Sequence, residues 1–283
     1  VVCCALAFVV FVVWPVPPAT PAPAPPPPTD TTTPTVPEQV VAPPRVVDAG
    51  ESTAVIHTMA ALRAGAERGE TEPMARLGAA LCDSDPAQAV VWLERAAQAG
   101  HPPAMFDLAA QLEHGRGTDK ALGEAFSWYS RASEAGEPRA MNRLATALRL
   151  GSSRAGIARD EAAAATLYRR AAEAGHLQAM NSLGTLLANG TGAPKDMAQA
   201  FRWFLRAAEG GHATAMKNVG QVYLAGVGAP QDVALGVSWL RRAAEAGSSG
   251  AMGCLARLFS ASEPLPRDER AALEWLQRGP LVA

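Results

Sequence analysis

Apolar residues recur along most of the chain at helical spacing, in units that each carry a Met at the same place. An apolar residue follows this Met after three positions and another after seven. Because spacings of three, four and seven fall on one side of a helix, each stretch is predicted to be an amphipathic helix. From Met105 onward the interval between units is 36 residues, except for 39 between Met141 and Met180. The column consists of Met74, Met105, Met141, Met180, Met216 and Met252.

A second helix is predicted in each unit by a column of large side chains, at Trp92, Trp128, Leu167, Trp203, Trp239 and Trp275. An Asp lies seven residues before five of these six positions, where its carboxylate can accept backbone N–H bonds at a helix start. These residues are Asp85, Asp160, Asp196, Asp232 and Asp268. A Gly then marks the expected helix end, at Gly100, Gly136, Gly175, Gly211 and Gly247.

The units are therefore helix-turn-helix repeats, and a single one cannot bury its apolar side alone. Stacking of about six such repeats predicts an all-α solenoid over residues 50–283. Residues 51–69 are predicted to form one helix before the first complete repeat, where it acts as an N-terminal cap. The last repeat is expected to leave its outer face open to a partner or to a second copy.

The sequence resembles the Sel1-like repeat family, which is related to the tetratricopeptide repeats. The resemblance is carried by the segment Ala179–Gly184, by the loop Asn189–Asp196 and by the stretch from Ala200 to His212. A unit of 36 residues with a Gly-x-Gly loop favours Sel1-like repeats over plain tetratricopeptide repeats. The resemblance implies a right-handed solenoid. Repeats one, three and six lack the Gly-x-Gly, so their loops are expected to differ in shape.

The N-terminal part of the chain has a different composition. Residues 1–14 are apolar and uncharged, which predicts either the core of a signal peptide or a retained membrane anchor. Residues 15–49 form a Pro-rich linker, because thirteen of the 23 prolines lie between Pro15 and Pro44. Both interpretations predict export, with the repeats in the periplasm and either anchored to the inner membrane or released.

Charge and motifs exclude several functions. The net charge is −2, and acidic and basic residues are interspersed, so no basic stripe points to nucleic acid. No zincin, nucleophile-elbow or phosphate-loop motif is present, and we therefore predict no catalytic residue, no metal site and no cofactor. His101, His176 and His212 lie about one repeat apart, which favours structural roles over shared metal binding.

In repeats of this kind the first helices usually line the concave side, and we place the candidate binding site there. Asn side chains are expected to bond the backbone of an extended peptide, while Arg143 and Lys217 contact a carboxylate. The alternative is an ordinary solvated helix surface. The candidate residues are Asn142, Arg143, Asn181, Thr185, Lys217, Asn218 and Gln221.

These observations favour a protein-binding scaffold or adaptor with a protein or peptide partner. The resemblance implies an envelope-associated regulator in a bacterium, attached to the membrane through its N-terminal segment if that segment is retained. One alternative is a β-lactamase-like or cell-wall enzyme, against which the absence of a Ser-x-x-Lys motif argues. A passive spacer is the other alternative, and the oligomeric state is left open.

Overall fold

The computed structural model describes residues 49–260 together with Asp268 and Trp275. They belong to one compact unit that begins at Asp48. The predicted apolar segment 1–14 lies outside the described residues, as does the predicted linker 15–49 up to its last residue. The second helix of the last repeat also falls outside them, except for Trp275.

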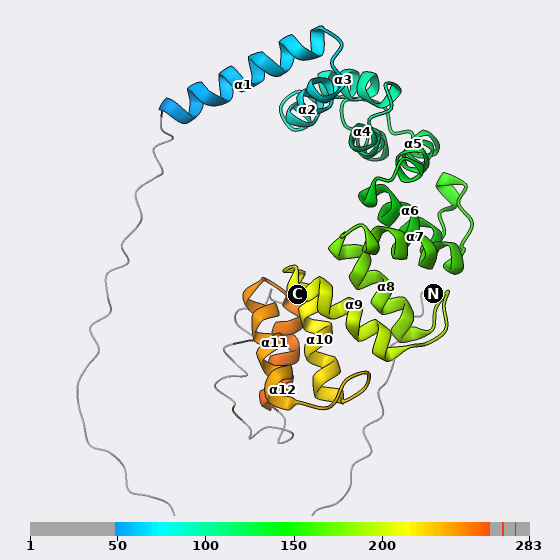
Figure 1. Cartoon of the computed structure of the whole chain (residues 1–283), viewed down its shortest axis with the longest axis vertical. Coiled ribbons are helices and arrows are strands. Elements are labelled where there is room, and N and C mark those ends of the chain that lie inside the picture. The colour runs from blue at the N-terminus through cyan, green and yellow to red at the C-terminus, as the bar shows by residue number, and fades with distance from the viewer. Residues whose placement is uncertain (1–48, 261–267, 269–274, 276–283) are drawn as a thin grey trace, which may run out of the picture. The chain divides into compact units, whose positions relative to one another are not determined.

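Helices make up about 75% of the described chain, and consecutive helices pack against each other in chain order (Figure 1). This confirms the predicted all-α solenoid. The first helix, α1, is a single long helix packed on α2, as expected for residues 51–69. The twelve α-helices within the described residues are α1 (Ala49–Glu67), α2 (Thr71–Leu81), α3 (Pro86–Gln98), α4 (Pro102–His114), α5 (Leu122–Glu134), α6 (Pro138–Leu150), α7 (Glu161–Glu173), α8 (Leu177–Asn189), α9 (Met197–Glu209), α10 (Ala213–Ala225), α11 (Val233–Glu245) and α12 (Ser249–Ser260).

The predicted Asp caps begin four of the second helices. Asp196 Oδ1 accepts a hydrogen bond from the backbone N–H of Gln199 at 2.8 Å. The same bond, to the N–H three residues later, is made by Asp85, Asp160 and Asp232. Such a cap satisfies a backbone donor that has no partner inside the helix. In repeat two, where the column holds Ala121, α5 begins without a side-chain cap.

Among repeats one to five, the loops between the two helices differ in length as predicted, whereas the loop of repeat six lies outside the described residues. In repeat four the second Gly of the Gly-x-Gly, Gly192, has a φ of +68° and lies against the start of α7. A Cβ at this position would overlap the carbonyl oxygen of Glu161, so the loop approaches the preceding repeat closely because it is Gly. Repeat three instead has a longer loop with a 3-10 turn at Ser153–Ala155 and a bridge between Ser152 and Ile157.

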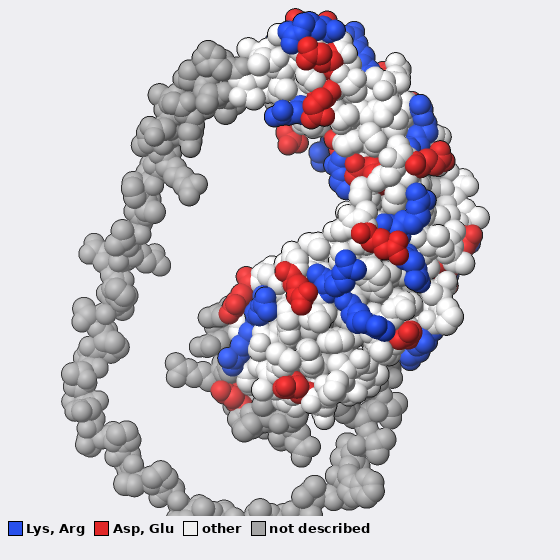
Figure 2. All heavy atoms as spheres, viewed as in Figure 1, with Lys and Arg blue, Asp and Glu red and all other residues white. Residues whose placement is uncertain are grey.

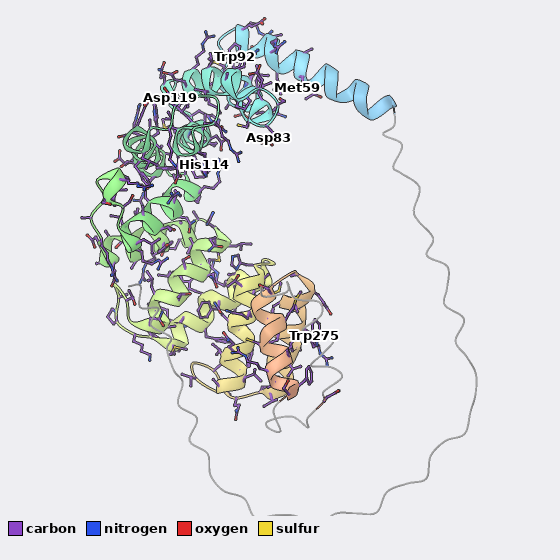
Figure 3. The ribbon with its side chains drawn as sticks, turned by 180° about the vertical axis from the view of Figure 1, so that it is seen from behind. Met59, Asp83, Trp92, His114, Asp119 and Trp275 are labelled. Carbon is purple, nitrogen blue, oxygen red and sulfur yellow. The ribbon has the colours of Figure 1, made fainter. Side chains whose placement is uncertain are left out.

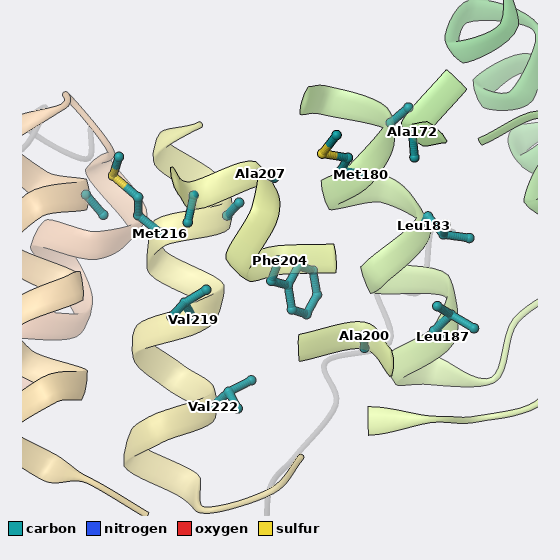
Figure 4. Packing of buried hydrophobic residues seen from close by; sticks show 14 of the residues in the cluster. Ala172, Met180, Leu183, Leu187, Ala200, Phe204, Ala207, Met216, Val219 and Val222 are labelled. Atoms are coloured by element: carbon teal, nitrogen blue, oxygen red, sulfur yellow. The ribbon is translucent and has the colours of Figure 1, made fainter. Parts of the chain in front are cut away.

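The apolar core consists of two clusters of buried residues. The C-terminal cluster includes Phe204 of α9, which lies between Leu183 of α8 and Val219 of α10 (Figure 4). Gly184, which directly follows Leu183 on α8, has a packing reason, since a Cβ there would lie 2.6 Å from the Phe204 ring.

The N-terminal cluster extends from Ala66 to Ala147 and is flanked by the partly buried side chains of Met59 and Trp92 (Figure 3). The two clusters meet at α6. Ala140 belongs to the N-terminal cluster and its neighbour Met141 to the C-terminal one. The stack is therefore built around two apolar cores that are joined at repeat three.

Charged side chains of both signs lie next to each other on the face that Figure 2 shows, without a large region of one sign. Within residues 49–260, no helix combines the length and the apolar character that a membrane crossing requires.

Candidate functional site

The candidate residues lie on one side of the first helices. We call this surface the first-helix face and define it by the residues one, two and five positions after each column Met of α4, α6, α8 and α10. These three positions fall on one side of a helix. Its members are Phe106, Asp107, Ala110, Asn142, Arg143, Thr146, Asn181, Ser182, Thr185, Lys217, Asn218 and Gln221.

Between α4 and α6 the face is charged, and the charges are paired with one another. Arg139 Nη1 donates to Asp107 Oδ1 at 3.0 Å. Arg143 forms an ion pair with Glu113, in which Arg143 Nε donates to Glu113 Oε2 at 3.0 Å. The Tyr129 hydroxyl donates to the same oxygen at 2.9 Å. Arg143 is thus held by a neighbouring repeat rather than presented to a ligand.

The electrostatics of this cluster keep Glu113 ionised. Burial alone would raise the pKa of the Glu113 carboxyl, but hydrogen bonds from Arg143 and Tyr129 outweigh it and lower that pKa below its ordinary value. Burial, and then the hydrogen bond to Glu113, raise the pKa of the Tyr129 hydroxyl strongly. At neutral pH the ion pair of Glu113 and Arg143 therefore carries no net charge. It joins repeats two and three.

Between α8 and α10 the face carries uncharged amides. Asn218 Nδ2 donates to Asn181 Oδ1 at 2.9 Å, which connects one repeat to the next. Asn181 is only 7% exposed. The hydroxyl of Thr185 donates to the backbone carbonyl of Asn181 at 3.0 Å. A side-chain amide has two donor hydrogens and an acceptor oxygen. The bond between Asn218 and Asn181 therefore leaves part of the hydrogen-bonding capacity of both side chains unused.

Three other candidate residues have polar atoms that make no ion pair and few hydrogen bonds. Asn142 Oδ1 is buried without a hydrogen-bond partner among the residues that the structure describes. Lys217 makes no ion pair with any residue in that part of the chain. Gln221 is exposed, and its Nε2 contacts Cys254 Sγ at 3.6 Å. Lys217 and Gln221 are therefore available to a ligand to a greater degree than Arg143.

A pocket lies at the edge of this face, where α6 ends. It has a volume of about 460 Å³ and lies between the end of α6, Arg159 and Glu161 around the start of α7, and one side of α8 with the loop that follows it. Two candidate residues, Asn181 and Thr185, contribute to it. The lining consists of Arg149, Leu150, Arg159, Glu161, Asn181, Ser182, Thr185, Leu186, Asn189 and Thr191.

The histidines have structural roles at helix starts. His176 Nδ1 accepts the backbone N–H of Ala179 at 3.2 Å, and His101 and His212 cap α4 and α10 in the same way. Burial lowers the pKa of His176 and of His212, which favours the neutral ring that this bond requires. Among the described residues, no group of three or more His, Cys, Asp or Glu side chains is arranged to hold a metal ion.

Sequence reasoning missed Glu113, Tyr129 and the arginines of the pocket. A usable signal existed for the ion pairs, because Asp107 and Arg139 are 32 residues apart, one helical turn less than the 36-residue period. Opposite charges at that separation lie on adjacent first helices. The pocket had no such signal, because it depends on how the end of α6 and the start of α7 pack against α8.

Pairs of helices that repeat at a fixed interval and stack on one another, with Asp residues at helix starts and Gly residues in the loops, define a solenoid repeat protein. The model of the Sel1 repeat matches six segments, which together cover more than half of the chain. The chain belongs to the Sel1 repeat family, which confirms the resemblance noted in its sequence. The matched segments are residues 74–101, 102–137, 138–176, 177–212, 213–248 and 251–279.

Two solved structures are similar to this chain. A Sel1 repeat protein from Oxalobacter formigenes is 26% identical with a TM-score of 0.71, and the match covers 81% of this chain and 96% of that one. The protein c5321, a protective antigen present in uropathogenic Escherichia coli strains, is 27% identical with a TM-score of 0.67. That match covers 77% of this chain, which spans about half (47%) of the length of c5321. None of the curated proteins compared with the chain matches it.

Membership of this family indicates a general class of activity. Sel1 repeat proteins generally mediate protein–protein interaction, and the family is typically non-enzymatic.

Proposed function

We propose that this chain is an adaptor that binds an extended peptide segment of a partner protein on the part of the first-helix face formed by α6, α8 and α10. The observation that carries the proposal is the composition of this surface. Seven of its nine positions are Asn, Ser, Thr or Gln, whereas the part on α4 and its neighbour α6 uses its charges in internal ion pairs.

The chemistry of such a surface suits a peptide backbone. An extended peptide presents alternating N–H and C=O groups, and a side-chain amide can bond either of them. The exposed side chains of Thr185 and Gln221 present a hydroxyl and an amide to such a backbone. Because the amides are held on packed helices, little order has to be gained on binding.

The charged contact is assigned to Lys217. Arg143 is committed to Glu113, and it therefore contributes to the spacing of the repeats rather than to the ligand. Lys217 is the cation of this surface that remains for an acidic side chain of the partner.

Selection from a random peptide library, displayed on phage and panned against the full chain, tests the proposal. Enriched peptides are then titrated against the Lys217→Ala, Gln221→Ala double variant by fluorescence anisotropy. A matched control, Lys120→Ala with Gln88→Ala, removes the same two residue types from exposed positions elsewhere.

We expect the first variant to weaken binding about thirtyfold, since charge-assisted and neutral hydrogen bonds together contribute on the order of 2 kcal/mol. The control variant is expected to bind like the original chain. If no peptide is enriched, or if both variants bind equally well, this surface is not the peptide site.

We further propose that the adaptor acts in a bacterial envelope, exported and either anchored to the inner membrane or released into the periplasm. The support is the apolar, uncharged sequence of residues 1–14 and the Pro-rich linker after it. Residues 1–49, with an initiating Met added, are fused to alkaline phosphatase, which is active only after export. Activity in intact bacteria is expected, and an inactive but stable fusion would contradict export.

A further inference from the structure

The loop of repeat three is the longest of the described loops that connect the two helices of a repeat. It occupies the extra residues of the 39-residue unit, and its backbone is closed by hydrogen bonds between Ser152 and Ile157 at 2.8 and 2.9 Å. No Gly-x-Gly packs this loop against the preceding repeat. One residue of the loop, Arg159, lines the pocket described above, together with the end of α6 and with Glu161 at the start of α7.

The opposite wall is one side of α8. Asn181, Ser182, Thr185 and Asn189 follow each other at helical spacing and bring amides and hydroxyls to the pocket. These groups supply both donors and acceptors. The volume of about 460 Å³ is within the range of sites that take small molecules or single side chains with their flanking backbone.

The charges of the pocket sum to one positive charge. Arg159 forms an ion pair with Glu161, which neutralises both. Arg149 makes no ion pair with any residue of the part that the structure describes. The pocket therefore complements an anionic group, and a guanidinium can bind a carboxylate through two parallel hydrogen bonds.

An apolar side chain stands beside this cation. Leu150, the next residue, lines the same pocket and is 63% exposed, which is unusual for a side chain of its size in a packed stack. The pocket thus offers a positive charge and an apolar contact side by side. A C-terminal residue such as Leu, Val or Phe carries a carboxylate and an apolar side chain on the same Cα. An internal Asp or Glu carries the carboxylate without the apolar group.

We infer that this pocket binds the C-terminal residue of the partner peptide, with its carboxylate on Arg149 and its apolar side chain on Leu150. The inference rests on the proposed peptide binding, because Asn181 and Thr185 belong both to the pocket and to the first-helix face. The amides and hydroxyls of α8 bond the peptide backbone that leads away from the pocket.

The test uses the full chain and a random peptide library displayed with free C-termini. Each enriched peptide is synthesised twice, as the free acid and as the C-terminal amide. Both forms are titrated against the original chain, against Arg149→Gln, and against the control Arg154→Gln. Arg154 lies exposed in the same loop but does not line the pocket.

We expect the enriched peptides to end in an apolar residue and the free acid to bind about tenfold more tightly than the amide, as for a charge-assisted hydrogen bond. Arg149→Gln is expected to remove this difference, and Arg154→Gln to preserve it. Thermal unfolding followed by circular dichroism verifies that both variants are folded.

Equal binding of acid and amide, or equal effects of the two Arg variants, would overturn the inference. If such peptides still depend on Lys217 and Gln221, the proposed function stands and only the pocket assignment fails. If no peptide binds, both fail together.

Discussion

Histidines begin three of the first helices in the same way. The rings at His101, His176 and His212 accept a backbone N–H through Nδ1, a bond that requires this nitrogen to be unprotonated. In the next repeat Ser248 occupies the same place, and its hydroxyl accepts the N–H of Ala251 at 3.3 Å. The chain therefore shows by itself which residue can replace the histidine without loss of the cap.

This arrangement predicts a pH dependence of stability. Burial lowers the pKa of His176 and His212, so the unfolded chain binds more protons between this lowered pKa and the ordinary value near 6.5. Their contribution to stability is thus present above about pH 6.5 and is lost as the pH falls. We expect the double variant His176→Ser, His212→Ser to lose less of its urea stability between pH 7.5 and 5 than the original chain does. The control His114→Ser, at the end of α4, should keep the original dependence; if all three chains respond alike, the caps are not the cause.

The ion pair between Glu113 and Arg143 gives a second prediction. Replacing Glu113 by Gln leaves Arg143 and Tyr129 without the carboxylate that holds both. We expect the free energy of unfolding to fall by about 1–3 kcal/mol, the usual contribution of hydrogen bonds to charged groups. Urea unfolding measures it, with Glu94→Gln, which removes an exposed carboxylate, as a control expected to stay within about 0.5 kcal/mol. Equal effects of the two changes would show that the network does not stabilise the fold.

At the scale of helices and loops, glycines serve two distinct purposes. Gly175 ends α7 with a φ of +90° and has open space around its Cα, so only its backbone conformation requires Gly. Gly192 has a positive φ as well, but the carbonyl of Glu161 also fills the space that a Cβ would need. One glycine therefore shapes a turn, while the other also lets a loop reach the neighbouring repeat.

Alanine at each position separates these effects. Gly175→Ala is expected to cost about 1–2 kcal/mol, the strain of a left-handed backbone at a residue with a Cβ. Gly192→Ala adds a steric overlap of about 1–3 kcal/mol and is expected to displace the loop from α7. Urea unfolding of the two variants gives the comparison. A smaller loss for Gly192→Ala than for Gly175→Ala would contradict the close approach.

The sequence predicted the elements better than the contacts between them. Asp196 could be assigned as a cap because a helix start is a local event, governed by residues three positions apart. Arg143 was expected to contact a ligand, but its position relative to Glu113 depends on how neighbouring repeats pack and on the rotamers of both side chains. The pocket beside Leu150 depends on an irregular loop, whose shape has no periodicity from which it could be predicted.

At the scale of the whole repeat region, the two apolar clusters give the stack an internal division. Each repeat contacts mainly its neighbours, so the stability of such a stack is approximately a sum over repeats and interfaces. At the interface of repeats two and three, the ion pairs of Arg139 and Arg143 lie where the apolar clusters meet. This interface depends on charge to a greater extent than the interface of α8 with α10, which the Asn181–Asn218 amide bond crosses.

The division predicts an effect of salt on local opening. In hydrogen exchange followed by mass spectrometry, raising NaCl from 0.05 to 1 M should weaken the protection of α4 to α6, because ions screen partly exposed pairs. Protection of α8 to α10 should change little. A uniform change along the chain would show that the ion pairs do not set the weakest interface.

The central claim is that a peptide lies on the amide-rich part of the first-helix face, and site-directed photo-crosslinking tests it most directly. A photoreactive amino acid is placed at Thr185, in the centre of this surface, or at Arg202, an exposed position on α9. Each chain is irradiated with an enriched library peptide and analysed by mass spectrometry. The account predicts a cross-link from position 185 and none from position 202. Cross-linking from position 202 alone, or equally from both, would contradict it.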